Sequence, residues 1–336
     1  MQRRFKDYFI ISLKGIAMGA ADAVPGVSGG TIAFISGIYE ELISTISNVN
    51  LHLFKTLKNE GFIAFWKQLN GNFLLALITG IIVSFVTFMR LAKYLIENHP
   101  ILIWSFFFGL IIASIIYVGK QIKAWKPITI IMLIVGAVLA YYITTLPSLG
   151  SNNNPYFLFI AGAIAICAMI LPGISGSFIL VILGAYKTLS DAFHDFDLKK
   201  IALFASGALV GLLSFSHVLK WLFKNYENFT LALLTGFIFG SLNKIWPWKE
   251  TVLVFNEQTG NSIAFSEVSN LGTLSIYQNT MEDFDTYKTV IEQSILPRYY
   301  SQINGEISSE LIPAIGLMIA GFLTIFILEK IGNKTS

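Results

Sequence analysis

The feature that most constrains this chain is a short polar break at the centre of each of two long hydrophobic stretches. The first stretch, Tyr8–Ser47, contains AVPGVSGGT at residues 23–31, and the second, Tyr156–Phe193, contains ILPGISGSF at residues 170–178. A membrane helix needs only about 20 consecutive apolar residues. Each stretch is therefore long enough for two half-helices, and the proline of each break predicts where the first half-helix ends.

The composition places the chain in a membrane. Of its 336 residues, 54% are hydrophobic and 13% are charged, whereas a soluble globular protein has about 25% charged residues. The net charge of +3 is too small to indicate a nucleic-acid partner, and the single cysteine, Cys167, excludes an internal disulfide. Six further apolar segments of about 20 residues predict transmembrane helices: Phe73–Leu95, Ile101–Val118, Ile128–Leu146, Ile201–Phe223, Leu231–Trp246 and Ile312–Leu328.

The distribution of basic residues predicts the topology. If each broken stretch enters the membrane and returns to the same side as a re-entrant hairpin, the basic N-terminus shares that side with the lysine-rich loops at 55–67 and 120–126. The opposite side then receives the segment Lys249–Glu310, which has nine acidic and three basic residues. This is the positive-inside pattern, and it predicts that both termini are cytoplasmic. The exceptions are Arg90, Lys93, Lys199 and Lys200.

We expect two membrane domains, residues 1–147 and 148–336. Within the first, residues 48–72 alternate apolar and basic residues at helix-like spacing, which predicts a helix lying on the cytoplasmic surface; a solvated connector is the alternative. Within the second, residues 249–310 contain ETVLVF and NSIAF, which predict strand pairing. The expected fold is an all-α polytopic membrane protein with a small extracytoplasmic insertion.

The two halves align as an internal repeat, each with one broken stretch and three transmembrane helices. Each half crosses the membrane three times, which is an odd number. The second half therefore starts on the opposite side of the membrane and has the inverted topology. Inverted repeats with broken helices are typical of secondary transporters, whose sites lie at the repeat interface. Gene duplication in a structural membrane protein is the alternative. Aligned pairs are Gly15 with Gly162, Pro25 with Pro172, Ser28 with Ser175, Gly29 with Gly176, Gly80 with Gly207, Gly109 with Gly236, and Gly136 with Gly321.

The two breaks indicate an anion-binding site. Irregular backbone at membrane depth must face protein or a wet cavity, because lipid cannot satisfy its polar groups. We expect Ser28 and Ser175 to cap the helices that follow, whose first N–H groups attract phosphate or carboxylate. Close helix packing through small residues is the alternative. The candidate phosphate-binding residues are Pro25, Gly26, Ser28, Gly29, Gly30, Thr31, Pro172, Gly173, Ser175, Gly176 and Ser177, assisted by Arg90 or Lys14.

Two acidic residues in the first broken stretch are candidates for proton coupling. Asp22 lies three residues before Pro25, and Glu40 follows Tyr39. Ionisable groups are costly in lipid and are functional candidates by default. The alternatives are a buried salt bridge between Asp22 and Lys14, and snorkelling of Arg90 to the membrane interface. The sequence predicts no catalytic residue, no metal site and no cofactor.

The motifs carry a family resemblance. MGAADAVPGVSGGTIAFISGIYEELI, residues 18–43, resembles the signature of the PopT-type polyprenyl-phosphate transporters, long catalogued as a bacterial domain of unknown function. LPGISGSFILVILGAY, residues 171–186, matches the second-half motif, and the resemblance covers essentially the whole chain. It implies a flippase that returns undecaprenyl phosphate, a polyprenyl phosphate lipid, from the outer to the cytoplasmic leaflet for reuse in cell-wall synthesis. The phosphate would occupy the site while the tail stays in lipid.

Two other functions compete with this one. Undecaprenyl-pyrophosphate phosphatases of the BacA type share inverted repeats, re-entrant hairpins and a Pro-Gly-x-Ser motif, but an arginine follows their serine. Here Gly29 and Gly176 occupy that place. Phosphoryl transfer needs positive charge at the phosphate, so the loss of the arginine argues against catalysis. The third possibility is a carrier or channel for small anions, which would use the same half-helix ends without an opening to lipid.

Overall fold

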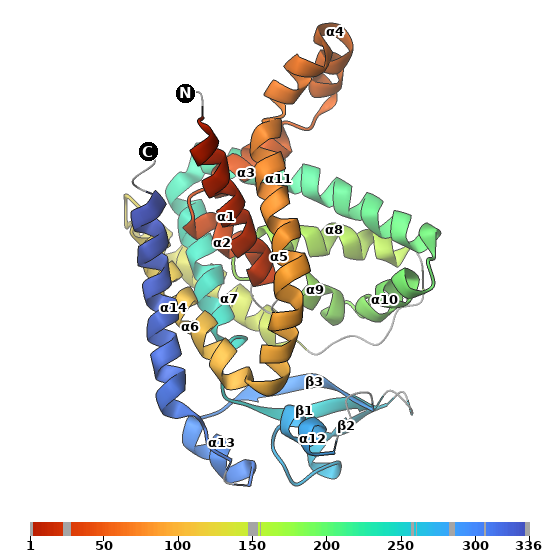
Figure 1. The fold of residues 1–336 in the computed structure, drawn as a ribbon, viewed down its shortest axis with the longest axis vertical. Coiled ribbons are helices and arrows are strands. Elements are labelled where there is room, and N and C mark those ends of the chain that lie inside the picture. The colour runs from red at the N-terminus through yellow and green to blue at the C-terminus, as the bar shows by residue number, and fades with distance from the viewer. Residues whose placement is uncertain are drawn as a thin grey trace.

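The computed structural model is mostly helical and describes residues 3–22, 28–146, 154, 156–256, 259, 261–281, 286–305 and 307–332. Figure 1 shows upright helices, a second group of helices running across them, and a small sheet at one end. The elements of the first half are α1 (Phe5–Asp22), α2 (Gly29–Ile35), α3 (Tyr39–Ser47), α4 (Leu51–Gln68), α5 (Gly71–Asn98), α6 (Pro100–Gly119) and α7 (Pro127–Thr145).

The second half has a similar order of helices without a counterpart of α4, and it adds a sheet. Its helices are α8 (Phe157–Ile170), α9 (Gly176–Ile182), α10 (Tyr186–His194), α11 (Leu198–Gly240) and α14 (Leu311–Gly332). Between α11 and α14 lie η1 (Ser241–Asn243), β1 (Lys249–Asn256), β2 (Ser262–Ala264), η2 (Phe265–Glu267), α12 (Leu274–Met281), β3 (Tyr287–Ser294) and α13 (Pro297–Ile303).

Each break separates a long helix from a short one. The first lies between α1, which ends at Asp22, and α2; the second lies between α8, which ends at Ile170, and α9. Both α2 and α9 have 7 residues. Proline accounts for the second break, because Pro172 cannot continue the hydrogen-bond ladder of α8. Pro25 and Gly26 lie outside the described residues.

The long helices pack in pairs that join the two halves. α6 packs along α14, and α7 packs along the second part of α11. At the first contact a Cβ on Gly109 would overlap the carbonyl of Met318, and at the second a Cβ on Gly236 would overlap the carbonyl of Leu133. Because only glycine lets two backbones approach this closely, these positions fix the pairing.

The contacts of aligned glycines correspond residue by residue. Gly321 meets Phe106 while its counterpart Gly136 meets Leu233, and the two partners lie three residues before Gly109 and Gly236 respectively. The same holds within each half, where α1 packs on α5 and α8 packs on α11. The remaining corresponding contacts are Gly15 on Leu77 and Gly162 on Phe204, and Gly80 on Ser12 and Gly207 on Phe159.

The spans predicted as Ile201–Phe223 and Leu231–Trp246 are the two parts of α11, which a kink separates. α11 runs from Leu198 to Gly240 and is interrupted by non-helical backbone at Tyr226 alone. The second predicted span was therefore too long at its C-terminal end, where Trp246 lies beyond η1. In Figure 1, α8 and the first part of α11 run across the upright α5, α6 and α14.

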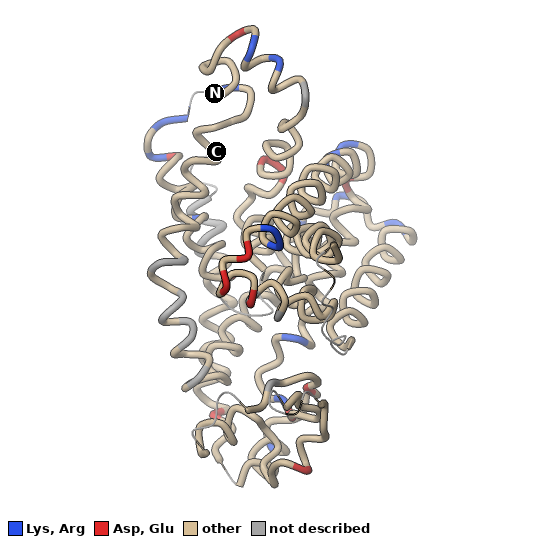
Figure 2. Tube along the Cα trace, turned by 90° about the vertical axis from the view of Figure 1, so that its right-hand side faces the viewer, with Lys and Arg blue, Asp and Glu red and all other residues tan. Residues whose placement is uncertain are grey.

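Length and apolar composition identify helices able to cross a membrane. Among the described residues these are Pro100–Gly119, Pro127–Thr145 and the continuous helical stretch Leu198–Asn243. Shorter apolar helical stretches are Gly71–Ser84, Phe157–Ile170 and Leu311–Phe326. In Figure 2, charged residues are sparse along the upright helices and gather in α4, near the sheet and at the end of the crosswise helices that faces the viewer.

The insertion forms a small sheet, as ETVLVF and NSIAF predicted. Within the described residues its strand order is β2-β1-β3, with both pairings antiparallel. Val254, Phe265 and Leu274 form a small core beneath it. The indole N–H of Trp248 donates a 2.9 Å hydrogen bond to the carbonyl of Ser309, which ties β1 to the start of α14.

Candidate functional site at the two breaks

The two breaks lie in direct contact, although about 140 residues of sequence separate them. The Gly173 amide donates a 2.9 Å hydrogen bond to the hydroxyl oxygen of Thr31. The Ser28 hydroxyl lies 3.4 Å from the carbonyl oxygens of both Met169 and Leu171. Polar groups from one half thus satisfy backbone groups that the break in the other half leaves without helix partners.

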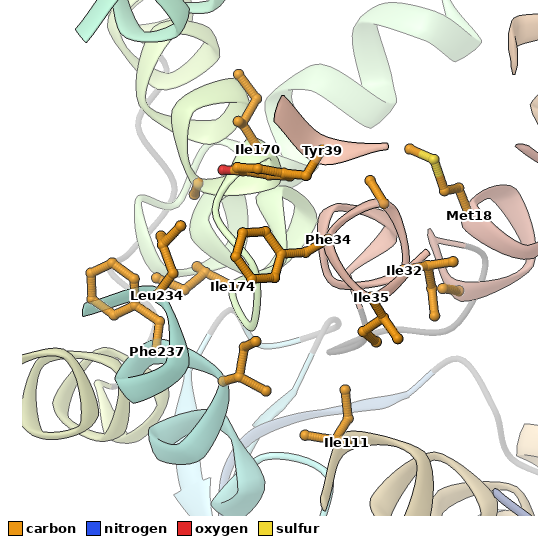
Figure 3. Close-up of a cluster of buried hydrophobic side chains, with 14 of the residues drawn as sticks. Met18, Ile32, Phe34, Ile35, Tyr39, Ile111, Ile170, Ile174, Leu234 and Phe237 are labelled. Atoms are coloured by element: carbon orange, nitrogen blue, oxygen red, sulfur yellow. The ribbon is translucent and has the colours of Figure 1, made fainter. Parts of the chain in front are cut away.

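The short helix α2 lies at the centre of the molecule. Every residue from Gly29 to Ile35 is buried. In the close-up of Figure 3, Phe34 points toward Ile174 of the second break, with Leu234 and Phe237 of α11 beyond it, and Ile35 points toward Ile111 of α6. This all-round burial explains why a helix of two turns, too short to be stable alone, persists here.

The first amide of α2 is already bound to a carboxylate. Asp22 Oδ1 accepts a 2.6 Å hydrogen bond from the Gly29 N–H. The prediction that Ser28 and Ser175 cap the following helices is wrong, because neither side chain makes a capping hydrogen bond. Ser28 bonds across the break instead, and Ser175 Oγ lies 2.9 Å from Ser177 Oγ. Negative charge at a helix N-terminus is favourable, so Asp22 occupies a position suited to an anion.

Two glycines are required by close approach at this contact. A Cβ on Gly30 would lie 2.7 Å from the Ile170 carbonyl oxygen, and one on Gly173 would lie 2.7 Å from the Phe237 carbonyl oxygen. Gly173 also has φ +85°, a conformation that residues with a side chain rarely adopt. The small residues of both breaks therefore have a packing role, which the sequence had left as an alternative.

The two breaks differ in exposure. Ser28 and Thr31 are 2% and 0% exposed. At the aligned end of α9, Ser175 and Gly176 are half-buried and Ser177 is exposed. Pro172 and Gly173 are buried. The described end of the first break, Ser28 to Thr31, is thus buried in this conformation, while the start of α9 is accessible.

The predicted charged residues do not gather at the breaks. Lys14 donates a 2.6 Å hydrogen bond to the Ser36 carbonyl, at the C-terminal end of α2 and away from its N-terminus. Glu40 is exposed in the first turn of α3. Arg90 lies in α5, and its side chain is outside the described residues. The alternative of a salt bridge between Asp22 and Lys14 is not observed, because each side chain forms a hydrogen bond to the backbone instead.

Sequence reasoning missed one side chain close to the breaks. The Tyr39 hydroxyl is buried and has no hydrogen-bond partner among the described residues. Its ring packs edge-on against Phe34 of α2 with ring centroids 4.9 Å apart, and Figure 3 places it beside Ile170. Tyr39 aligns with Tyr186 in the internal repeat, but Tyr186 is exposed, so the alignment alone does not indicate that Tyr39 is buried.

Comparison with known proteins decides the family. Residues 18–263 match the undecaprenyl phosphate translocase-like family. The chain belongs to that family. The match to the translocase-like family includes both breaks and reaches the start of the sheet, so the contact between Thr31 and Gly173 lies wholly within it. No solved structure matches this chain.

Two relatives of this chain have the same name. A polyprenyl-phosphate transporter of Vibrio cholerae is 45% identical over 252 residues, which cover 75% of this chain and 82% of the relative. A polyprenyl-phosphate transporter of Staphylococcus aureus is 33% identical over 260 residues, covering 72% of this chain and 87% of the relative. The apolar helices indicate a membrane protein, and both relatives are named as transporters.

Proposed function

We propose that the protein moves polyprenyl phosphate, as undecaprenyl phosphate, across the bacterial cytoplasmic membrane, with the phosphate bound between the two breaks. The observation that carries this proposal is the hydrogen bond between Gly173 and Thr31, combined with the unequal exposure of the breaks. Two polar backbone segments meet at the centre of an otherwise apolar protein, and the start of α9 is accessible while Ser28 and Thr31 are buried. Alternating access requires such a difference between the two sides of a site.

The corresponding glycine contacts support two inverted repeats with re-entrant hairpins, residues 1–147 and 148–336. In the proposed arrangement the first hairpin is α1 with α2, and the second is α8 with α9. The middle helix of each repeat packs on the last helix of the other, as α6 does on α14 and α11 on α7. A two-fold axis between the repeats produces this exchange of partners, whereas two unrelated halves would not be expected to pack in this way.

The polar contacts at the lysine-rich loops support the predicted orientation. Lys123 lies 2.9 Å from Glu227, which follows the kink of α11, and Lys220 donates a 3.3 Å hydrogen bond to Asn48 before α4. In Figure 1 both ends of the described chain lie at the same end as α4, opposite the sheet. We propose that this end is cytoplasmic, that α4 rests on the inner surface, and that the sheet is extracytoplasmic.

The carboxylate of Asp22 suggests how binding and release could be coupled. It accepts the Gly29 N–H that a phosphate oxygen would need. Phosphate can therefore bind the first break only when this carboxylate moves or takes up a proton. We propose Asp22 as the coupling residue. Glu40 stays a weaker proposal because it is exposed and lies on α3, beyond the end of α2.

Reconstituted vesicles test the proposal. Proteoliposomes and protein-free vesicles carry fluorescent polyprenyl phosphate in the outer leaflet, and an impermeant quencher measures what remains there. Transport predicts protein-dependent loss of quenching. The same vesicles loaded with the pyrophosphate lipid report any phosphatase, since phosphate release abolished by Ser28→Ala would identify an enzyme. Chloride flux as fast as lipid movement would instead identify a small-anion carrier.

A further inference from the structure

A second polar cavity lies between the helices and the sheet, apart from the contact between the breaks. It has a volume of about 270 Å³. The end of α7, the start of α9, the segment after α11 and strands β1 and β3 enclose it. The lining residues that matter here are Thr145, Phe178, Lys244, Lys249, Glu292 and Ser294.

Two lysines in this cavity share one carboxylate. Lys249 Nζ and Lys244 Nζ lie 3.4 Å and 3.6 Å from the same oxygen, Glu292 Oε2. Lys249 Nζ also donates a 2.7 Å hydrogen bond to the Lys244 carbonyl. The side chains of Lys244 and Glu292 are each 28% exposed, and that of Lys249 is 13% exposed. The three side chains are therefore partly buried, and the group carries a net positive charge.

Two lysines and one carboxylate leave one positive charge without a partner, and a partly buried charge of this kind is costly. Burial lowers the pKa of the Lys249 ammonium, which shows that its charge is costly at this position. Burial also acts to raise the pKa of Glu292, but the two ammonium groups outweigh it and hold that pKa below its ordinary value. Glu292 is thus ionised and neutralises one lysine. The second positive charge is left for an anion to neutralise.

Aromatic rings connect both lysines to the helices. Lys244 Nζ lies 4.8 Å from the ring centroid of Phe178 in α9, and Lys249 Nζ lies 5.0 Å from that of Trp104 in α6. Phe178 follows directly on Ser177, the exposed residue at the start of α9. The cationic cavity therefore adjoins the break that is accessible in this conformation.

An apolar surface groove adjoins the cavity. It is lined by Trp246, Ile295, Leu296 and Tyr299, together with Ser294, which also lines the cationic cavity. Leu296 is 71% exposed and Tyr299 is 45% exposed. A cationic cavity and an apolar groove that share a residue match the two ends of an amphiphile with an anionic head and a hydrocarbon chain.

We propose that Lys244 and Lys249 bind the phosphate monoester head of a prenyl lipid on the sheet side of the protein, before the head reaches the start of α9, while the first part of the prenyl chain lies on the groove around Leu296 and Tyr299. This inference rests on the proposed transport function for its substrate. Glu292 holds the lysines in place in the unliganded state and competes with the phosphate for them.

Binding to the whole protein in lipid nanodiscs tests this site. The probe is farnesyl phosphate, measured by calorimetry, with inorganic phosphate and farnesol as comparison ligands. Lys249→Gln removes one charge-assisted contact and should weaken farnesyl phosphate binding about tenfold. Glu292→Gln removes the competing carboxylate and should tighten binding severalfold. Arg298→Gln is the control, because Arg298 is an exposed cation of α13 outside the cavity and should leave binding unchanged.

The outcomes separate a binding site from a structural cluster. A cluster that only attaches the sheet to the helices predicts weaker or unchanged binding in both Lys249→Gln and Glu292→Gln, and this result overturns the proposal. Equal affinity for inorganic phosphate and farnesyl phosphate overturns the lipid source, as does tight binding of farnesol. Loss of farnesyl phosphate binding on Leu296→Ser, with inorganic phosphate binding retained, supports the groove.

Lipid movement in vesicles distinguishes this inference from the proposed function. If the cavity is an entry site, Lys249→Gln raises the lipid concentration needed for half-maximal movement and leaves the maximal rate close to that of the wild type. Equal half-maximal concentrations in the two proteins overturn the entry role. If the wild type moves no lipid, the transport proposal fails, and the opposite effects of Lys249→Gln and Glu292→Gln on binding still decide whether the cavity is a phosphate site.

Discussion

The Gly173 amide donates its hydrogen bond to the Thr31 hydroxyl across the contact between the two halves of the chain. Gly173 lies in the irregular backbone of the second break, and Thr31 lies in the first turn of α2 after the first break. Both residues are buried. Each break therefore depends on the other for part of its hydrogen bonding, and neither can move far without exposing an unpaired amide or hydroxyl in an apolar interior.

Thr31→Val should destabilise the protein more than Thr31→Ser. Valine has nearly the same shape as threonine but leaves the buried Gly173 N–H without an acceptor, which costs about 1–3 kcal/mol. Serine keeps the hydroxyl and loses only a methyl group. Thermal unfolding in detergent measures the difference. Equal melting temperatures for the two variants would show that the hydrogen bond contributes little, and that the breaks are held together by packing.

Asp22→Asn should remove the pH dependence of transport. Asparagine can still accept the hydrogen bond from the Gly29 N–H, but it carries no charge and takes up no proton. Initial rates of lipid movement, measured in vesicles over a pH series, should change with pH in the wild type and stay level in the variant. A variant whose rates follow the wild-type profile would exclude Asp22 as the coupling residue.

Tyr39→Phe separates a structural role from a role in binding. The hydroxyl is buried without a partner among the described residues, so its removal should keep or slightly raise the melting temperature. If the hydroxyl instead donates to the phosphate in another conformation, lipid movement should fall severalfold in the same variant. Reduced transport at unchanged stability supports binding. Unchanged transport would leave the tyrosine with a packing role only.

Gly109→Ala and Gly236→Ala should destabilise the protein to a similar degree. The added methyl group overlaps the Met318 carbonyl at the first position and the Leu133 carbonyl at the second, and overpacking of this kind costs about 1–3 kcal/mol. Gly119→Ala is the matched control, since a Cβ there meets nothing within 4 Å. Unfolding midpoints in detergent give the comparison. A large effect at only one of the two glycines would contradict equivalent roles in the two halves.

Cysteine labelling tests the unequal exposure of the two breaks. In a background with Cys167→Ser, Ser177→Cys should react readily with a water-soluble maleimide, whereas Ser28→Cys should be protected because Ser28 is 2% exposed. Addition of farnesyl phosphate should slow labelling at position 177 if the head occupies the start of α9. Equal reactivity of the two cysteines would rule out the sealed state of the first break.

The hydrophobic pattern predicted the fold well because it records which segments must avoid water. Phe73–Leu95 and Ile101–Val118 lie inside α5 and α6, and the Pro-Gly pair marks the second break. The pattern also predicted the two parts of α11 as separate spans, although no proline or glycine marks the kink at Tyr226. It placed the end of the second span beyond Gly240, where α11 ends.

The candidate site was harder to predict because it depends on partners from distant parts of the sequence. Small polar residues in the breaks indicated that the backbone was exposed to something, but not that Thr31 would bond Gly173. The capping prediction for Ser28 failed because its hydroxyl faces the Met169 and Leu171 carbonyls of the other break. The contact between Lys249 and Glu292 could not be predicted either, because the pairing of β1 with β3 brings together residues 43 positions apart.

The kink that joins the two parts of α11 at Tyr226 has a mechanical consequence. The first part of α11 packs on α8 and its second part on α7, so one helix is fastened to both halves of the protein. If the α8–α9 hairpin swings relative to the α6–α14 pair, α11 must bend, and Tyr226 is its one residue with non-helical backbone angles. Two rigid helices joined at a single kink can change their angle but not their length. This favours a rocking movement of the two halves over a sliding movement.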